Sequence, residues 1–198
     1  MLEAIAANDV LWECLQRLPA LELPDWYLGA GCLAQTVWNL AHGKPLNEDI
    51  LDYDLAYFDP DLSEHAEVMV AQRAKDLLAD LPVRIDAKNQ ARVHIWYPSK
   101  FGNAIQPYRS TEDAIATWPT TASAIGVRTG GSEVRVCAPF GTADLFGLVV
   151  RPNRVQITPE RYATKVARWA DRWSSLVVLP WEQGIGVAGL RLLPTSPG

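Results

Sequence analysis

The chain has 198 residues, 48% of them hydrophobic and 21% charged, and a formal net charge of −5 at pH 7. These proportions are typical of a globular domain and exclude wholesale disorder and a membrane-embedded protein. The acidic balance disfavours a protein that clamps duplex DNA. Cys14, Cys32 and Cys137 form no C-x-x-C pair, and the start of the chain does not read as a signal peptide. We therefore expect a cytoplasmic protein without a membrane segment, a disulfide framework or a zinc site.

The first half of the chain alternates strands and helices around a glycine turn. Apolar residues recur at helical or alternating spacing, and prolines and polar caps mark the ends of each segment. In chain order we predict a helix over 3–18, a strand over 25–28, a helix over 33–42, a strand over 51–58, a helix over 64–81 capped by Ser63, and a strand over 83–87. The turn Gly29-Ala30-Gly31 joins the first strand to its helix. This order predicts a βαβαβ-like half.

The second half is predicted to hold a hairpin and a long final helix. In chain order it has a helix over 112–118, strands over 124–128 and 133–138 joined at Gly130-Gly131, an ambiguous segment over 143–150, and a helix over 159–176 that begins at Thr158-Pro159. No internal repeat and no long linker divides the chain. We expect one α/β (α+β) domain over residues 1–178 and a partly flexible C-terminal tail over 179–198.

Two aspartates stand two residues apart on the predicted strand over 51–58. Because residues two apart on a strand point the same way, Asp52 and Asp54 project from one face. Like charges there call for a cation, and Mg²⁺ commonly takes one or two carboxylates together with substrate phosphates. Asp86, on the next strand, is a candidate third ligand, and three carboxylates holding two Mg²⁺ or Mn²⁺ ions would suit phosphoryl displacement. The alternatives are a solvated strand edge and, for Asp86, an ion pair with Arg84.

The glycine turn is a candidate phosphate site. Gly29 and Gly31 would let the backbone approach a phosphate closely, and a helix that begins near Cys32 would direct free N–H groups at the anion. The alternative is an ordinary turn.

Three donors follow the strand that carries Asp86. Asn89, Arg92 and His94 would lie close to a bound triphosphate or acceptor. Each also has a local interpretation, in which Asn89 caps a helix, Arg92 pairs with an acid and His94 is structural.

The final helix carries a basic row. At about 100° per residue, Arg161, Lys165, Arg168 and Arg172 fall within an arc of roughly 60° beside the apolar stripe. Such a row is either a solvated face or a surface that neutralises a triphosphate or an RNA backbone, and Lys165 is the preferred nucleotide-binding member.

Several short sequences in order resemble a known group of proteins. They are Gly29-Ala30-Gly31 with Val37-Trp38-Asn39, then Asp52-Tyr53-Asp54 through Asp59, then Lys88 through His94, and finally Ala138-Pro139-Phe140-Gly141 with Asp144-Leu145-Phe146. Together they resemble the polymerase-beta-like nucleotidyltransferase superfamily and, more narrowly, an uncharacterised bacterial nucleotidyltransferase-like family. The resemblance spans roughly residues 10–175.

The resemblance implies a mixed sheet flanked by helices and a role for each carboxylate. Asp52, Asp54 and Asp86 become candidate catalytic residues and metal ligands, with Asp86 nearest the acceptor hydroxyl. The chain departs from the superfamily at Cys32, where a serine is usual, and at Ala143, where an acidic residue is expected.

Three functions remain open at this stage. The first is a metal-dependent enzyme that moves a nucleoside monophosphate from an NTP to an unidentified hydroxyl acceptor and releases pyrophosphate. Net acidity favours a small molecule or a protein over RNA as that acceptor. The second, motivated by the two departures, is a non-catalytic nucleotide-binding or regulatory module of the same fold. The third is an interaction protein whose aromatic residues bind a partner.

Overall fold

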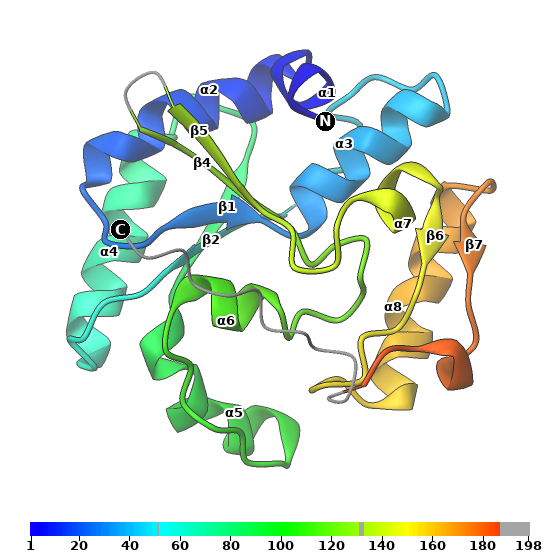
Figure 1. Ribbon diagram of the computed structural model, residues 1–198. Coiled ribbons are helices and arrows are strands. Elements are labelled where there is room, and N and C mark those ends of the chain that lie inside the picture. The colour runs from blue at the N-terminus through cyan, green and yellow to red at the C-terminus, as the bar shows by residue number, and fades with distance from the viewer. Residues whose placement is uncertain (51, 131–132, 187–198) are drawn as a thin grey trace.

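A five-stranded mixed sheet forms the centre of the molecule (Figure 1). The computed structural model describes residues 1–50, 52–130 and 133–186. The sheet order is β3-β2-β1-β4-β5. These strands are β1 (Tyr27–Gly29), β2 (Asp52–Tyr57), β3 (Arg84–Asn89), β4 (Gly126–Gly130) and β5 (Glu133–Cys137). Only β2 and β3 pair in parallel, and the other neighbours are antiparallel.

The predicted βαβαβ half is wrong at its first crossing, because β1 and β2 run antiparallel. Gly29, the last residue of β1, pairs with Asp54 near the start of β2. After the intervening helix the chain therefore returns to the end of β1 at which that helix began. The mixed sheet and the single α/β domain are confirmed.

Eight α-helices and three short 3₁₀ segments occur among the described residues. They are α1 (Leu2–Ala6), α2 (Asp9–Arg17), α3 (Gly31–Ala41), α4 (Glu64–Leu77), α5 (Val93–Phe101), α6 (Thr111–Ile115), α7 (Ala143–Phe146), α8 (Pro159–Arg172), η1 (Leu18–Leu21), η2 (Gln90–Arg92) and η3 (Trp181–Gln183). The predicted helix over 3–18 is two helices. Asn8 separates them, because its side-chain oxygen accepts a hydrogen bond from the Leu11 N–H and so caps α2.

The two faces of the sheet differ in how they are covered. On one face Leu28, Leu55 and Ala87 lie side by side through the β1–β2–β3 register, and all three are buried in the core with α2, α3 and α4. The alternating residues face the other way. On this second face α6 covers the β1–β4 part, where the Tyr27 hydroxyl donates to Glu112 at 2.7 Å. The β2–β3 part of the second face is left open.

Helix α8 is anchored on α3 through tryptophans. Trp38 of α3 packs edge-on against Trp169 and Trp173, with ring centroids 5.0 and 5.4 Å apart. The Trp173 indole N–H donates to Asn39 at 2.8 Å. This anchor holds the C-terminal end of α8 against α3, on the right of the view in Figure 1.

The chain continues past α8 into a second, two-stranded sheet. Its strands are β6 (Val149–Val150) and β7 (Val177–Val178), which pair in parallel. Beyond β7 the Leu179 N–H donates to Val150 and the Ile185 N–H to Pro152. Residues 187–198 of the predicted tail lie outside the described residues. In the described parts of the chain, no helix combines the length and the apolar character needed to cross a bilayer.

Candidate functional site

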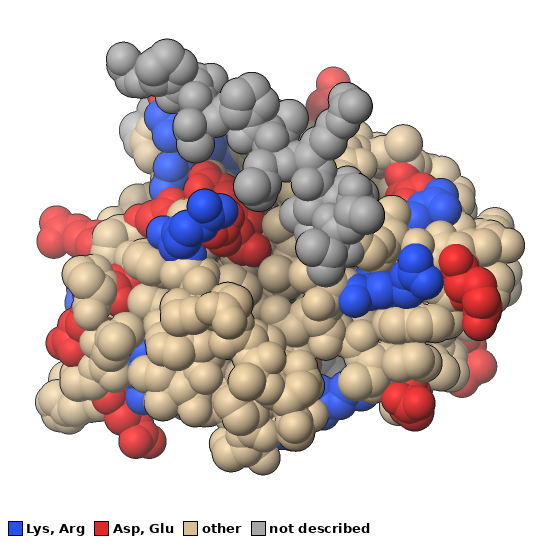
Figure 2. All heavy atoms as spheres, turned by 60° about the horizontal axis from the view of Figure 1, so that its bottom comes forward, with Lys and Arg blue, Asp and Glu red and all other residues tan. Residues whose placement is uncertain are grey.

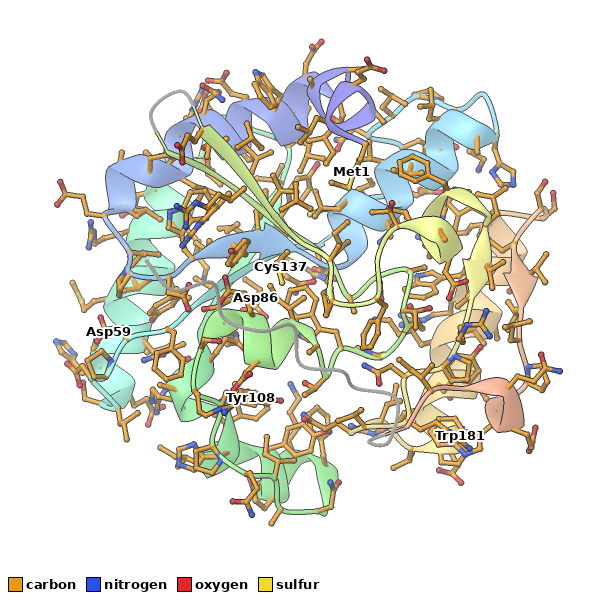
Figure 3. All side chains as sticks on the ribbon, in the orientation of Figure 1. Met1, Asp59, Asp86, Tyr108, Cys137 and Trp181 are labelled. Atoms are coloured by element: carbon orange, nitrogen blue, oxygen red, sulfur yellow. The ribbon has the colours of Figure 1, made fainter. Side chains whose placement is uncertain are left out.

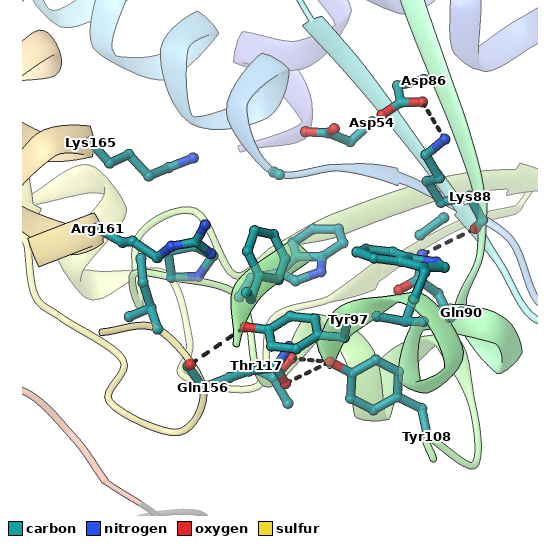
Figure 4. A pocket seen from close by; sticks show the side chains of 18 of the residues that line it. Asp54, Asp86, Lys88, Gln90, Tyr97, Tyr108, Thr117, Gln156, Arg161 and Lys165 are labelled. Carbon is teal, nitrogen blue, oxygen red and sulfur yellow. Dashed lines mark hydrogen bonds and ion pairs between the residues drawn. The ribbon is translucent and has the colours of Figure 1, made fainter. Parts of the chain in front are cut away.

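A cleft of about 640 Å³ opens on the uncovered part of the sheet. Figure 4 shows acidic side chains from β2 and β3 at one end, basic side chains from α8 along one side and aromatic rings across from the acids. Figure 3 shows Asp86 near the middle of the molecule. The polar lining includes Asp54, Asp86, Lys88, Gln90, Gln156, Arg161, Lys165 and Arg168.

The sheet register brings two of the three predicted carboxylates together. Asp54 and Asp86 are direct neighbours on the parallel strands β2 and β3, and both line the cleft. Asp52 is one step away, opposite Arg84, and forms an ion pair with it. Asp86 also has a basic partner, since the Lys88 ammonium lies 3.1 Å from its carboxylate. Of these three carboxylates, only Asp54 has no ion-pair partner among the described residues.

Asp54 is held in an environment that disfavours its charge. The pKa of its carboxyl is raised to about 6, chiefly by burial and also by the neighbouring charges of Asp86 and Asp52. Lys165 and a hydrogen bond from the Gly31 backbone N–H lower that pKa. A half-buried carboxylate beside a second carboxylate attracts a cation strongly.

Lys165 reaches the same end of the cleft from α8. Burial lowers the pKa of its ammonium and the charge of Asp54 raises it, so the two groups act on each other across the cleft. The ammonium also lies 4.9 Å from the ring centroid of Trp169, which fixes the lower part of the side chain. Arg161 and Arg168 line the cleft on the same side of α8, whereas Arg172 donates to the Asp49 carbonyl instead.

The glycine turn lies between the Trp118 ring and Asp54. Neither glycine needs a positive φ, and the left-handed residue is Ala30, at φ 57° and ψ −119°. A Cβ on Gly29 would lie 2.7 Å from the Trp118 ring, so this glycine admits an aromatic ring against the strand. Gly31 donates its N–H to Asp54 and begins α3. The turn therefore links the helix start to the carboxylate.

Three other predicted nucleotide-binding side chains are engaged elsewhere. Cys32 is fully buried, and its thiol donates to the Gly29 carbonyl at 3.3 Å, so only its backbone N–H at the start of α3 remains for a ligand. Asn89 is buried and donates to Asp59 and Asp61. Arg92 forms an ion pair with Glu67 and donates to Leu62.

The contacts of Asn89 and Arg92 agree with the local interpretations of the sequence, a helix cap for Asn89 and an ion pair with an acid for Arg92. Asn89 also caps η2 through the Ala91 N–H. Neither side chain lines the cleft, and neither does that of His94, which follows them in α5. Their direct contact with a nucleotide is left as a sequence-based prediction that this geometry does not favour.

The residues of the cleft fit a divalent ion only in part. No group of three His, Cys, Asp or Glu side chains within the described ranges forms a metal cluster. Mg²⁺ is commonly bound by one or two carboxylates together with substrate phosphates. Asp54 and Asp86 are two adjacent carboxylates of this kind, and Asp54 has no ion-pair partner in the part of the chain that the structure describes. Asp54 and Asp86 therefore fit an ion delivered with a triphosphate. Asp52 could join them only if Arg84 released it.

Sequence reasoning missed the aromatic side of the cleft. It comes from α5 and from the segment after α6, and α5 was not predicted at all. Pro98 lies within this helix, and a proline in the sequence predicts a helix end. Apolar residues also occur on all sides of the helix, so the sequence shows no helical spacing of hydrophobic residues. The cap at Asn89 and the left-handed Gly102 that ends α5 were the available signals.

A solved structure shares this fold. A structure solved by NMR, described as revealing a CCA-adding enzyme head domain, is similar to this chain with a TM-score of 0.71 and 25% sequence identity, over 90% of this chain and 93% of that chain. The chain belongs to the nucleotidyltransferase family whose sequence profile matches residues 16–178. No curated protein matches it. The predicted family resemblance is confirmed.

Proposed function

We propose that this protein transfers a nucleoside monophosphate from an NTP to a hydroxyl group and releases pyrophosphate. The observation that carries the proposal is the pair Asp54 and Asp86, in register on β2 and β3 and facing Lys165 across the cleft. Membership of a nucleotidyltransferase family supports an NTP as the donor.

The reaction needs a proton acceptor and a site for the phosphates. The hydroxyl oxygen of the acceptor attacks the α-phosphorus, a new O–P bond forms, and the bond to pyrophosphate breaks with its electron pair leaving on pyrophosphate. Asp86, with 53% of its side chain exposed, takes the hydroxyl proton. When bound, Mg²⁺ or Mn²⁺ supplies charge neutralisation for the triphosphate.

The phosphates are held by α8 and by the start of α3. Lys165 and Arg168 provide positive charge along one side of the cleft. The backbone N–H groups of Cys32 and Leu33 belong to the first turn of α3, where no helical acceptor exists for them. Catalysis would come from positioning and charge stabilisation.

A non-catalytic nucleotide-binding module is the second candidate. The observation that favours it is the pairing of Asp52 with Arg84 and of Asp86 with Lys88, which leaves Asp54 as the unpaired member of the three candidate metal ligands in the described structure. Such a module would bind a nucleotide without releasing pyrophosphate. For the enzyme, the acceptor is proposed to be a small molecule or a protein.

Pyrophosphate release tests the proposal directly. Each NTP would be incubated with Mg²⁺ or Mn²⁺ and cell extract as the acceptor source, using the wild type, Asp54→Asn and Asp86→Asn. Asp171→Asn is the matched control, because Asp171 is exposed on α8 and does not line the cleft. Release that is lost in the first two variants and kept in the control supports nucleotidyl transfer.

Thermal shift with the same nucleotides separates the two candidates. A metal-dependent rise in Tm without pyrophosphate release would select the binding module. A chain that neither releases pyrophosphate nor responds to any NTP would contradict both.

A further inference from the structure

The side of the cleft across from the carboxylates is an aromatic wall, made of Trp96 and Phe101 from α5 and Trp118 from the segment after α6. Figure 2 views the molecule with the α5 and α6 side of Figure 1 turned forward, and uncharged side chains cover much of the middle of this view. A charged substrate alone would not call for such a surface. The proposed transfer reaction, on which the following inference rests, leaves this wall without a role.

Two rings of the wall, Trp118 and Phe101, are fixed in position by their neighbours. The Trp118 ring lies directly over Gly29, where a Cβ would approach it to 2.7 Å. Phe101 packs edge-on against the buried Tyr97, with ring centroids 4.4 Å apart. Tyr97 in turn donates to the Gln156 backbone carbonyl at 3.5 Å. Ligand binding at the wall would therefore require little ordering of side chains, which favours affinity.

The three wall residues remain partly exposed. Trp96, Phe101 and Trp118 are each only half-buried although they line a concave site. Exposed aromatic faces inside a cleft gain free energy when a flat apolar group covers them. The amide of Gln90, which donates to Lys88 at 3.0 Å, borders the same cleft and leaves its carbonyl oxygen for the edge of such a group.

The basic row connects the wall to the carboxylates. At the near end the Arg161 guanidinium lies 3.7 Å from the centre of the Phe101 ring. One turn further along α8, Lys165 interacts with Asp54. Figure 4 shows both basic side chains reaching into the cleft from the same helix. A ligand that suits this arrangement has a polyanionic end and a flat aromatic end.

We propose that the aromatic wall is the nucleobase subsite, in which the base of the NTP stacks on Trp96 while its phosphates follow Lys165 and Arg168. Stacking on aromatic side chains tolerates any base, because every base has a π-face. Trp96 is then a specificity residue for nucleotides over base-free polyphosphates.

A comparison of NTPs with inorganic tripolyphosphate tests the subsite. Dissociation constants of the four NTPs and of tripolyphosphate, each with Mg²⁺, would be measured by calorimetry for the wild type, Trp96→Leu and Trp96→Phe. Trp12→Leu is the matched control, because Trp12 is a half-buried tryptophan on α2, away from the cleft. Thermal unfolding of each variant checks that the fold is kept.

We expect at least one NTP to bind the wild type about 10-fold or more tightly than tripolyphosphate, since stacking on one ring contributes on that order. Trp96→Leu should abolish most of this ratio without changing tripolyphosphate binding, and Trp96→Phe should restore much of it. Equal binding of NTPs and tripolyphosphate to the wild type, or an unchanged ratio in Trp96→Leu, would overturn the base subsite and leave phosphate binding intact. Absence of binding by every ligand would overturn the proposed function itself.

Discussion

Asp144 and Asp54 are both partly buried carboxylates, but their pKa values are shifted in opposite directions. Burial acts to raise the pKa of Asp144, but hydrogen bonds from Arg151 at 2.9 Å and Thr121 at 2.6 Å outweigh it and hold that pKa below its usual value. Asp54 has no such ion pair among the described residues, and burial raises its pKa to about 6. Asp144 stabilises the fold, whereas the charge of Asp54 opposes folding, as expected if Asp54 binds a cation in the proposed reaction.

The difference explains why both residues appear in the resemblance to one family but in different roles. Asp144 ties α7 to Arg151, which directly follows β6, and to Thr121. Asp54 stands in register with Asp86 at the head of the cleft. A carboxylate with satisfied partners indicates structure, and one with a raised pKa in a cleft indicates a functional site.

The largest expected contrast is in turnover. Asp54→Asn should lower pyrophosphate release by about 100-fold or more, because it removes a charge that acts on the reacting phosphate. Asp144→Asn should leave the rate per folded molecule within about 2-fold, since its carboxylate lies outside the cleft. Initial rates normalised to the folded fraction measure both. Similar losses of pyrophosphate release in the two variants would contradict the distinction between a functional Asp54 and a structural Asp144.

Stability should move in opposite directions for the same two substitutions. In EDTA at pH 7, Asp54→Asn should raise the free energy of unfolding by about 1–2 kcal/mol. This gain is smaller than the raised pKa of Asp54 alone would imply, because water still screens the half-buried carboxylate. Asp144→Asn should lower it by about 1–2 kcal/mol through lost charged hydrogen bonds. Urea unfolding measures both values.

The pH dependence of stability shows independently whether each carboxylate stabilises or destabilises the folded chain. The folded chain holds the Asp54 proton up to about pH 6 and the unfolded chain loses it near pH 4, so Asp54 makes stability fall as pH rises between these values. Asp144 acts oppositely, and its contribution is lost as pH falls through its lowered pKa. Unfolding in EDTA from pH 3 to 7 should show that Asp54→Asn removes the decline between pH 4 and 6. A decline that persists in the variant would contradict the assignment.

Lys165→Met sharpens the comparison from the basic side of the cleft. It should weaken NTP binding about 10-fold through loss of one charge on the phosphates. It should also raise the pKa of Asp54 further, because Lys165 is the opposing charge that lowers it. Calorimetry measures the first effect and the pH course of stability the second. Lys75→Met, at an exposed position of α4, should change neither.

The smallest expected effect lies in the turn before α3. Ala30 has a backbone conformation that strongly favours glycine, and Ala30→Gly should relieve about 1–3 kcal/mol of strain. The greater chain entropy of glycine offsets about 0.5–1 kcal/mol of that gain. A net rise of about 1 kcal/mol in urea unfolding is expected, and a loss of stability would show that the turn is not strained.

Local patterns in the sequence determined a large part of the fold. The strands β2 and β3, the capped helix α4 and the amphipathic α8 follow from alternation, caps and helical spacing, which depend on residues close in the chain. The same local rule set Asp52 and Asp54 on one face and identified the basic row. The resemblance between short ordered sequences added the family.

Only the tertiary structure decided which of these residues act together. Strand pairing placed Asp86 beside Asp54 and Arg84 beside Asp52, and it set β1 antiparallel to β2, because register depends on segments far apart in the chain. Burial engaged the side chains of Cys32, Asn89 and Arg92 in contacts within the fold. The aromatic wall needed α5 and the segment after α6 to line the same cleft. Sequence periodicity reports which way a side chain faces on its own element, but the partner that it meets there is set by packing between distant elements.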